Sequence, residues 1–210
     1  MALRISEIFH SLEGEGLHMG LPQVFIRLQG CRVGCSWCDT KYTWPERAKG
    51  SAALTEEEVL GRVAAFPCRR VSITGGEPLE QDIRRLVRLL KERGYWVCLE
   101  TSGQYFEPEV MTAVDFVSCD VKGPSSGVAP NREAVGRILR EHGSKVQFKI
   151  VVSGPEDLAF AKEWAHLPNL ILQKDCYSKF EFAERVKTEF PGARYGLQLH
   201  KILWGDRRGV

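Results

Sequence analysis

Residues 24–40 read VFIRLQGCRVGCSWCDT, and the fold class can be inferred from this segment and its neighbours. It begins as an alternating, β-rich run and passes directly into a glycine-bearing loop with cysteines at positions 31, 35 and 38. Three thiolates on one tight loop can bind three irons of a cubane [4Fe–4S] cluster. The fourth iron then stays open, as in catalytic metal sites that keep one position for a ligand. Cys31, Cys35 and Cys38 are therefore the candidate cluster ligands.

A structural zinc site is the main alternative for these cysteines. Such a site needs a fourth ligand and usually shows paired C-x2-C units, which this chain lacks. The other four cysteines, Cys68, Cys98, Cys119 and Cys176, are scattered along the chain. Cluster ligation is thus the better interpretation.

Around the cysteine loop, short β-rich runs alternate with helical patterns, without a linker or a fixed-period repeat. This alternation predicts βα units on a largely parallel sheet. Thr55 and Glu58 form a capping-box pattern, and Gly94 and Gly143 stand where helices should end. The expected strands are 23–29, 70–74, 95–100, 115–120, 145–152, 169–173 and 194–200, and the expected helices are 55–66, 80–93, 131–141, 155–164 and 178–189.

These strands have one apolar face and one face with hydrogen-bonding groups. In 145–152, Gln147 and Lys149 oppose four apolar side chains, and in 23–29 Arg27 opposes three. A closed barrel fills its interior with branched apolar residues and needs about 250 residues for eight units. Only about six units are present by this count. The predicted fold class is therefore α/β, an incomplete, open βα barrel that encloses a ligand, with residues 1–210 as a single domain.

Composition narrows the function classes. The 210 residues carry a net charge of +2 with Lys and Arg spread along the chain, whereas a nucleic-acid binder usually shows a concentrated basic stripe. The start, MALRISEIFH, lacks the apolar core of a signal peptide, and no apolar run approaches the roughly 20 residues of a membrane span. Seven cysteines, three of them within eight residues, favour metal chemistry in a reducing cytoplasm. We expect no nucleic-acid partner, no membrane partner and a cytoplasmic location.

The C-x3-C-x2-C spacing, with Trp37 before the third cysteine, resembles that of the radical S-adenosylmethionine superfamily. The resemblance implies that the open iron binds S-adenosylmethionine and that reductive cleavage gives a radical that abstracts hydrogen from a substrate. It also implies cofactor contacts from three later segments that end strands: GGEP at 75–78, ETSG at 100–103 and DVKG at 120–123. The expected cofactor-binding residues are Trp37, Gly75, Gly76, Glu77, Glu100, Ser102, Asp120, Lys122 and Gln173.

A narrower resemblance is carried by FHSLEGEG at 9–16, CDTKYTW at 38–44 and LQLHK at 197–201. These segments, with VFIRLQGC at 24–31, are similar to the 7-carboxy-7-deazaguanine synthases over nearly the whole chain. The resemblance implies a homodimer that contracts the ring of 6-carboxy-5,6,7,8-tetrahydropterin with loss of ammonia, assisted by Mg²⁺. It implies Thr40 as the Mg²⁺ ligand. The expected substrate-binding residues are Leu12, Gly14, Glu15, Gly16, Arg27 and His200.

Physical chemistry agrees with these roles. A pterin offers N–H groups that Glu15 could accept from, and a carboxylate that suits the guanidinium fork of Arg27. His200, on the polar face of the last expected strand, could close the far side of the ring. An electron donor such as flavodoxin or ferredoxin would supply the reductant.

The chain departs from the family at two places. Lys174 stands where a proline often follows the glutamine that Gln173 matches, and the segment around Asp120 and Lys122 varies between subgroups. A glycyl-radical-enzyme activase is the nearest rival, but activases typically show DGPG and C-H-N where this chain has EGEG and C-D-T. A cluster-binding sensor is a third possibility, although it would need neither GGEP nor a polar barrel lining.

Overall fold

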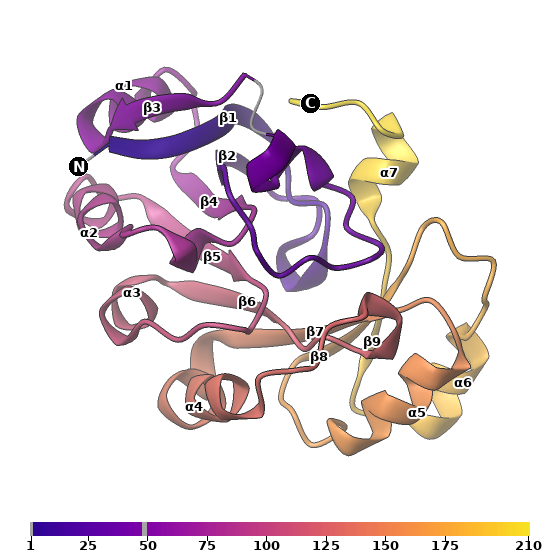
Figure 1. Ribbon diagram of the computed structural model, residues 1–210. Coiled ribbons are helices and arrows are strands. Elements are labelled where there is room, and N and C mark those ends of the chain that lie inside the picture. Colours follow the sequence, from indigo (N-terminus) through magenta and orange to yellow (C-terminus); the bar gives the residue numbers. More distant parts are fainter. Residues whose placement is uncertain (1, 48–49) are drawn as a thin grey trace.

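The computed structural model describes residues 2–47 and 50–210 and forms one nine-stranded sheet with helices packed outside it (Figure 1). The strands are β1 (Ala2–Leu12), β2 (Pro22–Leu28), β3 (Ala52–Thr55), β4 (Arg70–Gly75), β5 (Trp96–Thr101), β6 (Phe116–Asp120), β7 (Val146–Val152), β8 (Leu170–Lys174) and β9 (Arg194–Gly196). The α-helices are α1 (Glu56–Ala64), α2 (Arg84–Glu92), α3 (Pro108–Ala113), α4 (Arg132–His142), α5 (Pro155–Glu163), α6 (Ala183–Glu189) and α7 (Leu199–Trp204).

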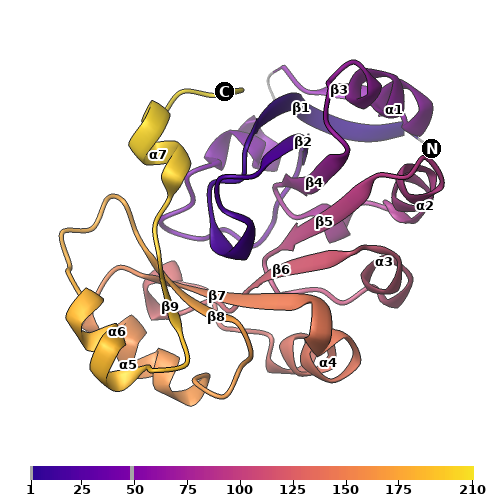
Figure 2. The ribbon, with the colours of Figure 1, turned by 180° about the vertical axis from the view of Figure 1, so that it is seen from behind.

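The sheet is parallel from β2 through β4, β5, β6, β7 and β8 to β9, and β1 joins β2 and β3 by antiparallel pairing. The strand order is β3-β1-β2-β4-β5-β6-β7-β8-β9, so β3 and β9 are the two edges. Within the described residues these edges do not pair with each other, which confirms the predicted open barrel. Helices cover its outer side, as the two opposite views show (Figures 1 and 2). In the described part of the chain, no helix has the length and apolar character needed to cross a bilayer.

Local sequence signals explain where several helices begin and end. Thr55 and Glu58 make the predicted capping box at α1, with the Thr55 hydroxyl accepting from the Glu58 N–H at 3.3 Å. Gly94 follows α2 with a φ of +74°, the left-handed conformation expected after a helix end. Gly143 caps α4 in the right-handed region instead, since a short 3₁₀ turn follows it directly.

The two faces of the sheet differ as the alternation predicted. Val24, Ile26 and Leu28 are fully buried in the hydrophobic core under the helices, whereas Phe25 and Arg27 line an inner cavity. The inner side also carries buried polar groups on successive strands: Gln23, Ser72, Thr74, Ser118, Gln147 and Gln173. Ser72, Thr74, Ser118 and Gln147 are hydrogen-bonded within the chain, whereas the amide oxygens of Gln23 and Gln173 have no partner among the described residues.

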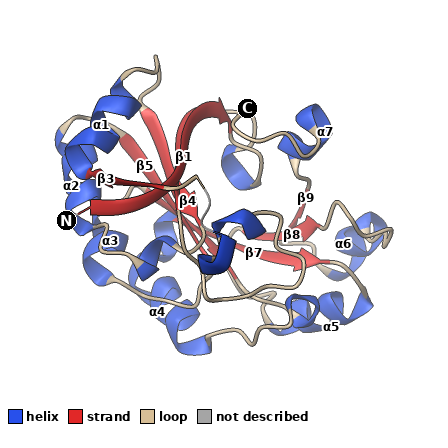
Figure 3. Cartoon of the chain, turned by 45° about the horizontal axis from the view of Figure 1, so that its top comes forward, coloured by secondary structure: helices blue, strands red, loops and turns tan. Residues whose placement is uncertain are grey.

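The structure corrects the sequence prediction at both ends of the chain. The strands β1 and β3 and the helix α3 were not predicted. The last strand is shorter than expected: its pairing with β8 ends at Gly196, and Leu199–Trp204 form α7 (Figure 3). The helix start is tied to the 13–21 loop, because the Leu199 N–H donates to the Gly14 carbonyl at 2.8 Å. The placement of His200 on a strand was therefore wrong, since a tertiary contact overrides the alternating pattern.

Candidate active site

The inner face of the sheet encloses a cavity of about 440 Å³ that gathers most of the expected site residues. The cysteine loop, the segments after β4, β5 and β6, and helix α7 all contribute to its wall. The expected residues that line it are Leu12, Gly14, Glu15, Arg27, Cys31, Cys35, Trp37, Cys38, Thr40, Gly75, Gly76, Glu100, Ser102, Asp120, Lys122, Gln173 and His200.

The cysteine loop and the glycine segment after β4 are packed directly together. A Cβ atom on Gly76 would lie 1.9 Å from the Gly30 carbonyl oxygen and 2.9 Å from the Cys31 Cβ, so only glycine fits there. Gly34 supports the loop turn with a φ of +74°. The N–H of Cys38 donates to the Cys35 carbonyl at 3.2 Å. The loop is thus wound tightly with all its thiols at one cavity wall.

The three free thiols fit the ligand set of an iron–sulfur cluster, because they line one cavity and a cubane cluster binds each thiolate through a separate iron. Among the described residues, no three His, Cys, Asp or Glu side chains are grouped so that they could hold one metal ion. Burial raises the pKa of Cys31 to about 11, because the charged thiolate is less stable than the neutral thiol in a site shielded from water. Iron ligation would stabilise the buried thiolate, since metals bind the deprotonated form of cysteine.

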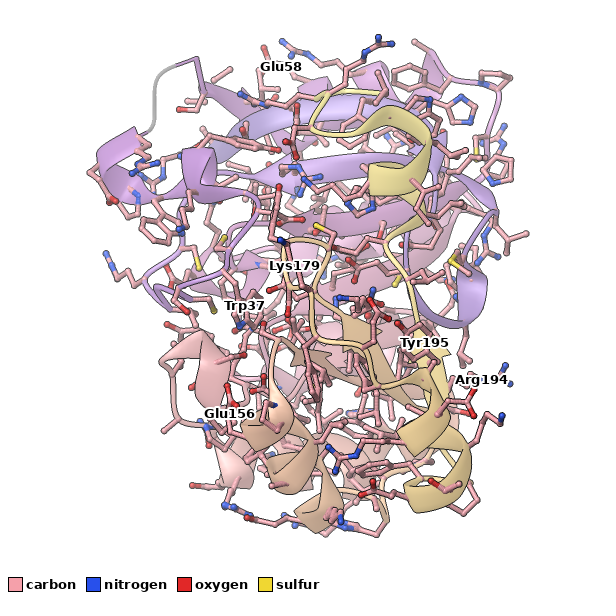
Figure 4. The ribbon with its side chains drawn as sticks, turned by 90° about the vertical axis from the view of Figure 1, so that its right-hand side faces the viewer. Trp37, Glu58, Glu156, Lys179, Arg194 and Tyr195 are labelled. Carbon is pink, nitrogen blue, oxygen red and sulfur yellow. The ribbon has the colours of Figure 1, made fainter. Side chains whose placement is uncertain are left out.

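A second wall carries a charged network around Lys122. Its ammonium group pairs with Asp120 and lies 5.0 Å from the ring centroid of Trp37. Trp37 is fixed in turn by its indole N–H, which donates to the Ser125 hydroxyl at 3.1 Å. Burial opposes the charge on Lys122, yet Asp120 raises the pKa of the ammonium above its usual value. The Lys122 ammonium is therefore a cation beside the cysteine loop. Trp37, the aromatic neighbour of this cation, is labelled in Figure 4.

Glu77 and Gly16 are the two expected site residues that do not line the cavity. The Glu77 side chain is fully buried and accepts from the Thr101 hydroxyl at 2.9 Å and from the Ser102 N–H at 2.7 Å. These bonds hold the ETSG segment against the GGEP segment, and the contact of Glu77 with a cofactor amino group stays a prediction. Gly16 lies behind the wall, where a Cβ would lie 2.1 Å from the Gln147 amide nitrogen.

The floor of the cavity holds two carboxylates that approach each other. Glu100 accepts from the Ser72 hydroxyl at 2.7 Å and from the Thr74 hydroxyl at 2.8 Å. Glu13, which was not predicted, is 8% exposed and bonds to the amide of Gln23. Burial, with the nearby charge of Glu100 as the second cause, raises the pKa of Glu13 to about 8. This acid therefore stays protonated at neutral pH.

Glu15 and His200 line the same cavity, and the Glu15 N–H donates to the Glu13 carboxylate at 3.1 Å. Glu15 is paired with Lys149 and accepts from the Gln198 amide at 2.8 Å. The His200 Nε2 lies 3.9 Å from a carboxylate oxygen of Asp39. Although burial favours the neutral acid, His200 and Arg27 hold the pKa of Asp39 at about 2. Glu15 and His200, both predicted to bind the substrate, therefore face the cavity, Glu15 beside Lys149 and His200 beside Asp39.

Arg27 is also held by its own chain. Its Nε donates to the Glu7 carboxylate at 2.8 Å, and the guanidinium carbon lies 5.6 Å from the centroid of the Phe9 ring. Burial alone would lower the pKa of Arg27, but Tyr42 and Glu7 raise it. Sequence reasoning missed Glu7 and Tyr42. The alternation of Glu7, Phe9 and Ser11 could have found the strand, since all three line the cavity.

Thr40 and Gln173 have few partners in the chain. The Thr40 hydroxyl lies 3.5 Å from the Cys38 sulfur and makes no capping bond to the turn that follows. Gln173 is 1% exposed, yet among the described residues its amide oxygen has no hydrogen-bond partner. Buried polar atoms normally find one, so Gln173 is a candidate for contact with a ligand.

An open α/β barrel with a three-thiol loop on its inner wall is the architecture of a radical enzyme that uses S-adenosylmethionine. A family model for the radical SAM superfamily matches residues 25–156. The sequence is 35% identical to 7-carboxy-7-deazaguanine synthase from Chlorobaculum tepidum, over 99% of this chain and 97% of the relative. It is 30% identical to the enzyme of the same name from Bacillus subtilis, over 98% of each chain.

Solved structures agree. QueE from Escherichia coli superposes with a TM-score of 0.73 at 30% identity and covers 94% of both chains. Streptococcus suis SuiB bound to S-adenosylmethionine gives a TM-score of 0.57 at 16% identity over 80% of this chain and 48% of the other, a likeness of fold. The chain belongs to the 7-carboxy-7-deazaguanine synthase family of the radical SAM superfamily.

Proposed function

We propose that this protein is a radical SAM lyase that converts 6-carboxy-5,6,7,8-tetrahydropterin into 7-carboxy-7-deazaguanine with loss of ammonia. This is a step towards 7-deazapurines such as queuosine. The observation that carries the proposal is one cavity with two sets of residues on its wall. Three thiols and the glycines after β4 form one set, and a carboxylate, an arginine and a histidine suited to a pterin form the other.

The first set fits the cofactors. Cys31, Cys35 and Cys38 would hold a [4Fe–4S] cluster, and the bare backbone of Gly75 and Gly76 leaves room for S-adenosylmethionine beside it. When bound, these groups supply the radical that removes a hydrogen atom from the substrate. The protein's part is to place the substrate in a site from which water is excluded.

Residues on this wall divide the contacts to S-adenosylmethionine. Lys122 can pair with its carboxylate, and the Ser102 segment is held in place from behind by Glu77. The unpaired amide oxygen of Gln173 can accept from a donor on the cofactor. The Lys122 ammonium, the Ser102 hydroxyl and the Gln173 amide thus offer the kinds of contact that the methionine and adenosine parts of S-adenosylmethionine need.

The second set fits the pterin. Glu15 can accept N–H groups of the pyrimidine ring, and Arg27 can bind the substrate carboxylate with its free terminal nitrogens. His200 approaches from α7, on the side closed by Asp39. Leu12 and Gly14 line the same cavity. The His200 ring approaches Gly14 so closely that no side chain fits there, since a Cβ would lie 2.2 Å from the His200 Nδ1.

Thr40 is our candidate Mg²⁺ ligand. Its hydroxyl lies at the cavity wall, and an alcohol oxygen with waters suits this hard cation. We also infer a cytoplasmic homodimer that receives its electron from a flavodoxin or ferredoxin. The Mg²⁺ ligand, the cytoplasmic location, the homodimer and the electron donor are all inferred from resemblance to the family.

The activase alternative is not favoured. The full-length relatives from Chlorobaculum tepidum and Bacillus subtilis are named as deazaguanine synthases. A cavity of about 440 Å³ lined by both polar and apolar side chains also suits a small ring system more than the backbone of a protein.

Anaerobic turnover tests the proposal. The reconstituted protein receives reductant, S-adenosylmethionine, Mg²⁺ and 6-carboxytetrahydropterin, and mass spectrometry detects products. We expect 7-carboxy-7-deazaguanine together with 5′-deoxyadenosine. Formation of 5′-deoxyadenosine with untouched pterin would leave the radical chemistry standing and reject the substrate.

A further inference from the structure

Glu7 owes its position in the cavity wall to an irregularity in β1. Leu3 and Ile5 face the hydrophobic core, and regular alternation would place residue 7 on that side as well. The pairing of β1 with β2 shifts between Ile5 and Glu7, so that Glu7 lies opposite Arg27 and faces the cavity. Such bulges redirect side chains and are found beside functional sites. The chain therefore places a carboxylate beside the arginine on the inner wall.

Three donors surround this carboxylate. Glu7 Oε1 accepts from Arg27 Nε at 2.8 Å and from the Tyr42 hydroxyl at 2.8 Å. Glu7 Oε2 lies 3.5 Å from Arg208 Nη2, and the Arg208 guanidinium carbon lies 3.5 Å from the centroid of the Tyr42 ring. The Glu7 side chain is 16% exposed, so these bonds are partly shielded from water. The carboxylate is held in one place by three separate segments of the chain.

The two terminal nitrogens of the Arg27 guanidinium are left free by its bond to Glu7. A guanidinium offers five N–H donors in one plane, of which Nε carries one. Glu7 binds only Nε, and the two terminal nitrogens donate no hydrogen bond to any described residue. Because the group is planar, fixing Nε and stacking the plane near Phe9 also fixes where the terminal nitrogens point. They are then available together for one carboxylate.

We propose that Glu7 is a positioning residue that sets the orientation of Arg27 and thereby gives the site its preference for a carboxylated pterin. Tyr42 and Arg208 keep Glu7 in place. The inference rests on the proposed function, in which Arg27 binds the substrate carboxylate. It assigns the selectivity to a side chain on β1 that does not itself touch the substrate.

A charge effect alone predicts the opposite sign, which makes the proposal testable. If Glu7 acted only through its charge, its removal would strengthen binding of an anionic ligand, because a nearby negative charge is lost. If Glu7 orients Arg27, its removal weakens binding, because the fork loses its fixed geometry.

The experiment compares two ligands on the reconstituted enzyme with S-adenosylmethionine and Mg²⁺, by anaerobic titration calorimetry. The ligands are 6-carboxytetrahydropterin and 6-methyltetrahydropterin, which lacks the carboxylate. For Glu7→Leu we expect at least a tenfold rise in the Kd of the carboxylated pterin and less than a twofold change for the methyl compound. For Glu7→Gln, whose amide oxygen can still accept from Nε, we expect a two- to fivefold rise.

Glu163→Leu is the matched control. Glu163 binds Arg132 at 2.6 Å, and Arg132 lies 4.9 Å over the Trp164 ring, so the pair repeats the carboxylate–arginine–aromatic arrangement away from the cavity. We expect unchanged Kd values for this variant, and a change equal to that of Glu7→Leu would overturn the inference. Thermal unfolding of each variant checks the fold, and Glu7→Gln decides the question if Glu7→Leu does not fold.

The outcomes separate the two proposals. If the wild type binds both pterins equally, the proposed carboxylate site on Arg27 fails. If the wild type discriminates and both Glu7 variants keep or increase that discrimination, the positioning role of Glu7 is refuted while the proposed function stands.

Discussion

Replacing Glu13 by glutamine should remove a pH-dependent part of the stability of this protein. Glu13 is buried at the cavity floor, and its pKa is raised from 4.5 to about 8 by burial and by the charge of Glu100. It bonds to the Gln23 amide, whose oxygen has no partner among the described residues. A neutral Gln at position 13 keeps the shape and can donate to that oxygen.

The sign follows from proton linkage. Between pH 4.5 and 8 the folded state keeps the Glu13 proton and the unfolded state does not, so this contribution is complete below 4.5 and is lost as pH rises towards 8. For these two pKa values the contribution falls by roughly 2 kcal/mol between pH 6 and pH 8. Glu13→Gln has no such proton to lose.

Differential scanning calorimetry of the reconstituted wild type and Glu13→Gln, at pH 6 and pH 8, measures the effect. For a chain of this length, roughly 2 kcal/mol corresponds to about 4–8 °C in Tm. The Tm of Glu13→Gln relative to wild type should therefore rise by about that amount between the two pH values. Because the cluster loop is common to both proteins, its own pH dependence cancels in the difference. An unchanged difference, or a fall, would refute the buried neutral acid.

Three further predictions concern the cavity wall. Gly76→Ala should abolish cluster assembly, because the new Cβ would overlap the Gly30 carbonyl. The readout is loss of the visible absorbance near 400 nm after reconstitution, and the control variant Gly61→Ala, on an open helix face, should keep this absorbance. Thr40→Val should reduce the stimulation of turnover by Mg²⁺ severalfold, and an unaltered metal titration would reject Thr40 as a ligand. Lys149→Met leaves the carboxylates of Glu15 and Asp120 without the cation that they share, so Tm should fall by several degrees. A Tm equal to that of the wild type would show that these two ion pairs do not stabilise the protein.

Much of the chemistry of the site was readable from the chain because each contributing segment carries a local motif, although the segments are far apart in sequence. The spacing of Cys31, Cys35 and Cys38 and the glycines that end β4 are local signals, and the structure places all of them at one cavity. The alternation that set Arg27 apart from its apolar neighbours likewise follows from strand geometry alone. Periodicity also predicted the parallel strands and five of the helices, since each buries one continuous apolar face.

The fold at the ends of the chain depends on contacts between distant segments. In β1 a bulge between Ile5 and Glu7 shifts the side-chain alternation, so the strand alternates regularly on each side of the bulge but not across it. In α7 an alternating LQLH pattern becomes helical, because β9 stops pairing and Leu199 bonds to Gly14 instead. Neither event has a local signal.

Residue types and their spacing were enough to predict the class of the fold, the three-cysteine loop and most of the residues that line the cavity. The states of individual groups follow from tertiary contacts: burial raises the pKa of Glu13, Glu77 joins two segments behind the wall, and Glu7 holds Arg27. The physical reason is that residue type and spacing fix which groups a strand presents. Charge state and orientation instead depend on burial and on partners far along the chain.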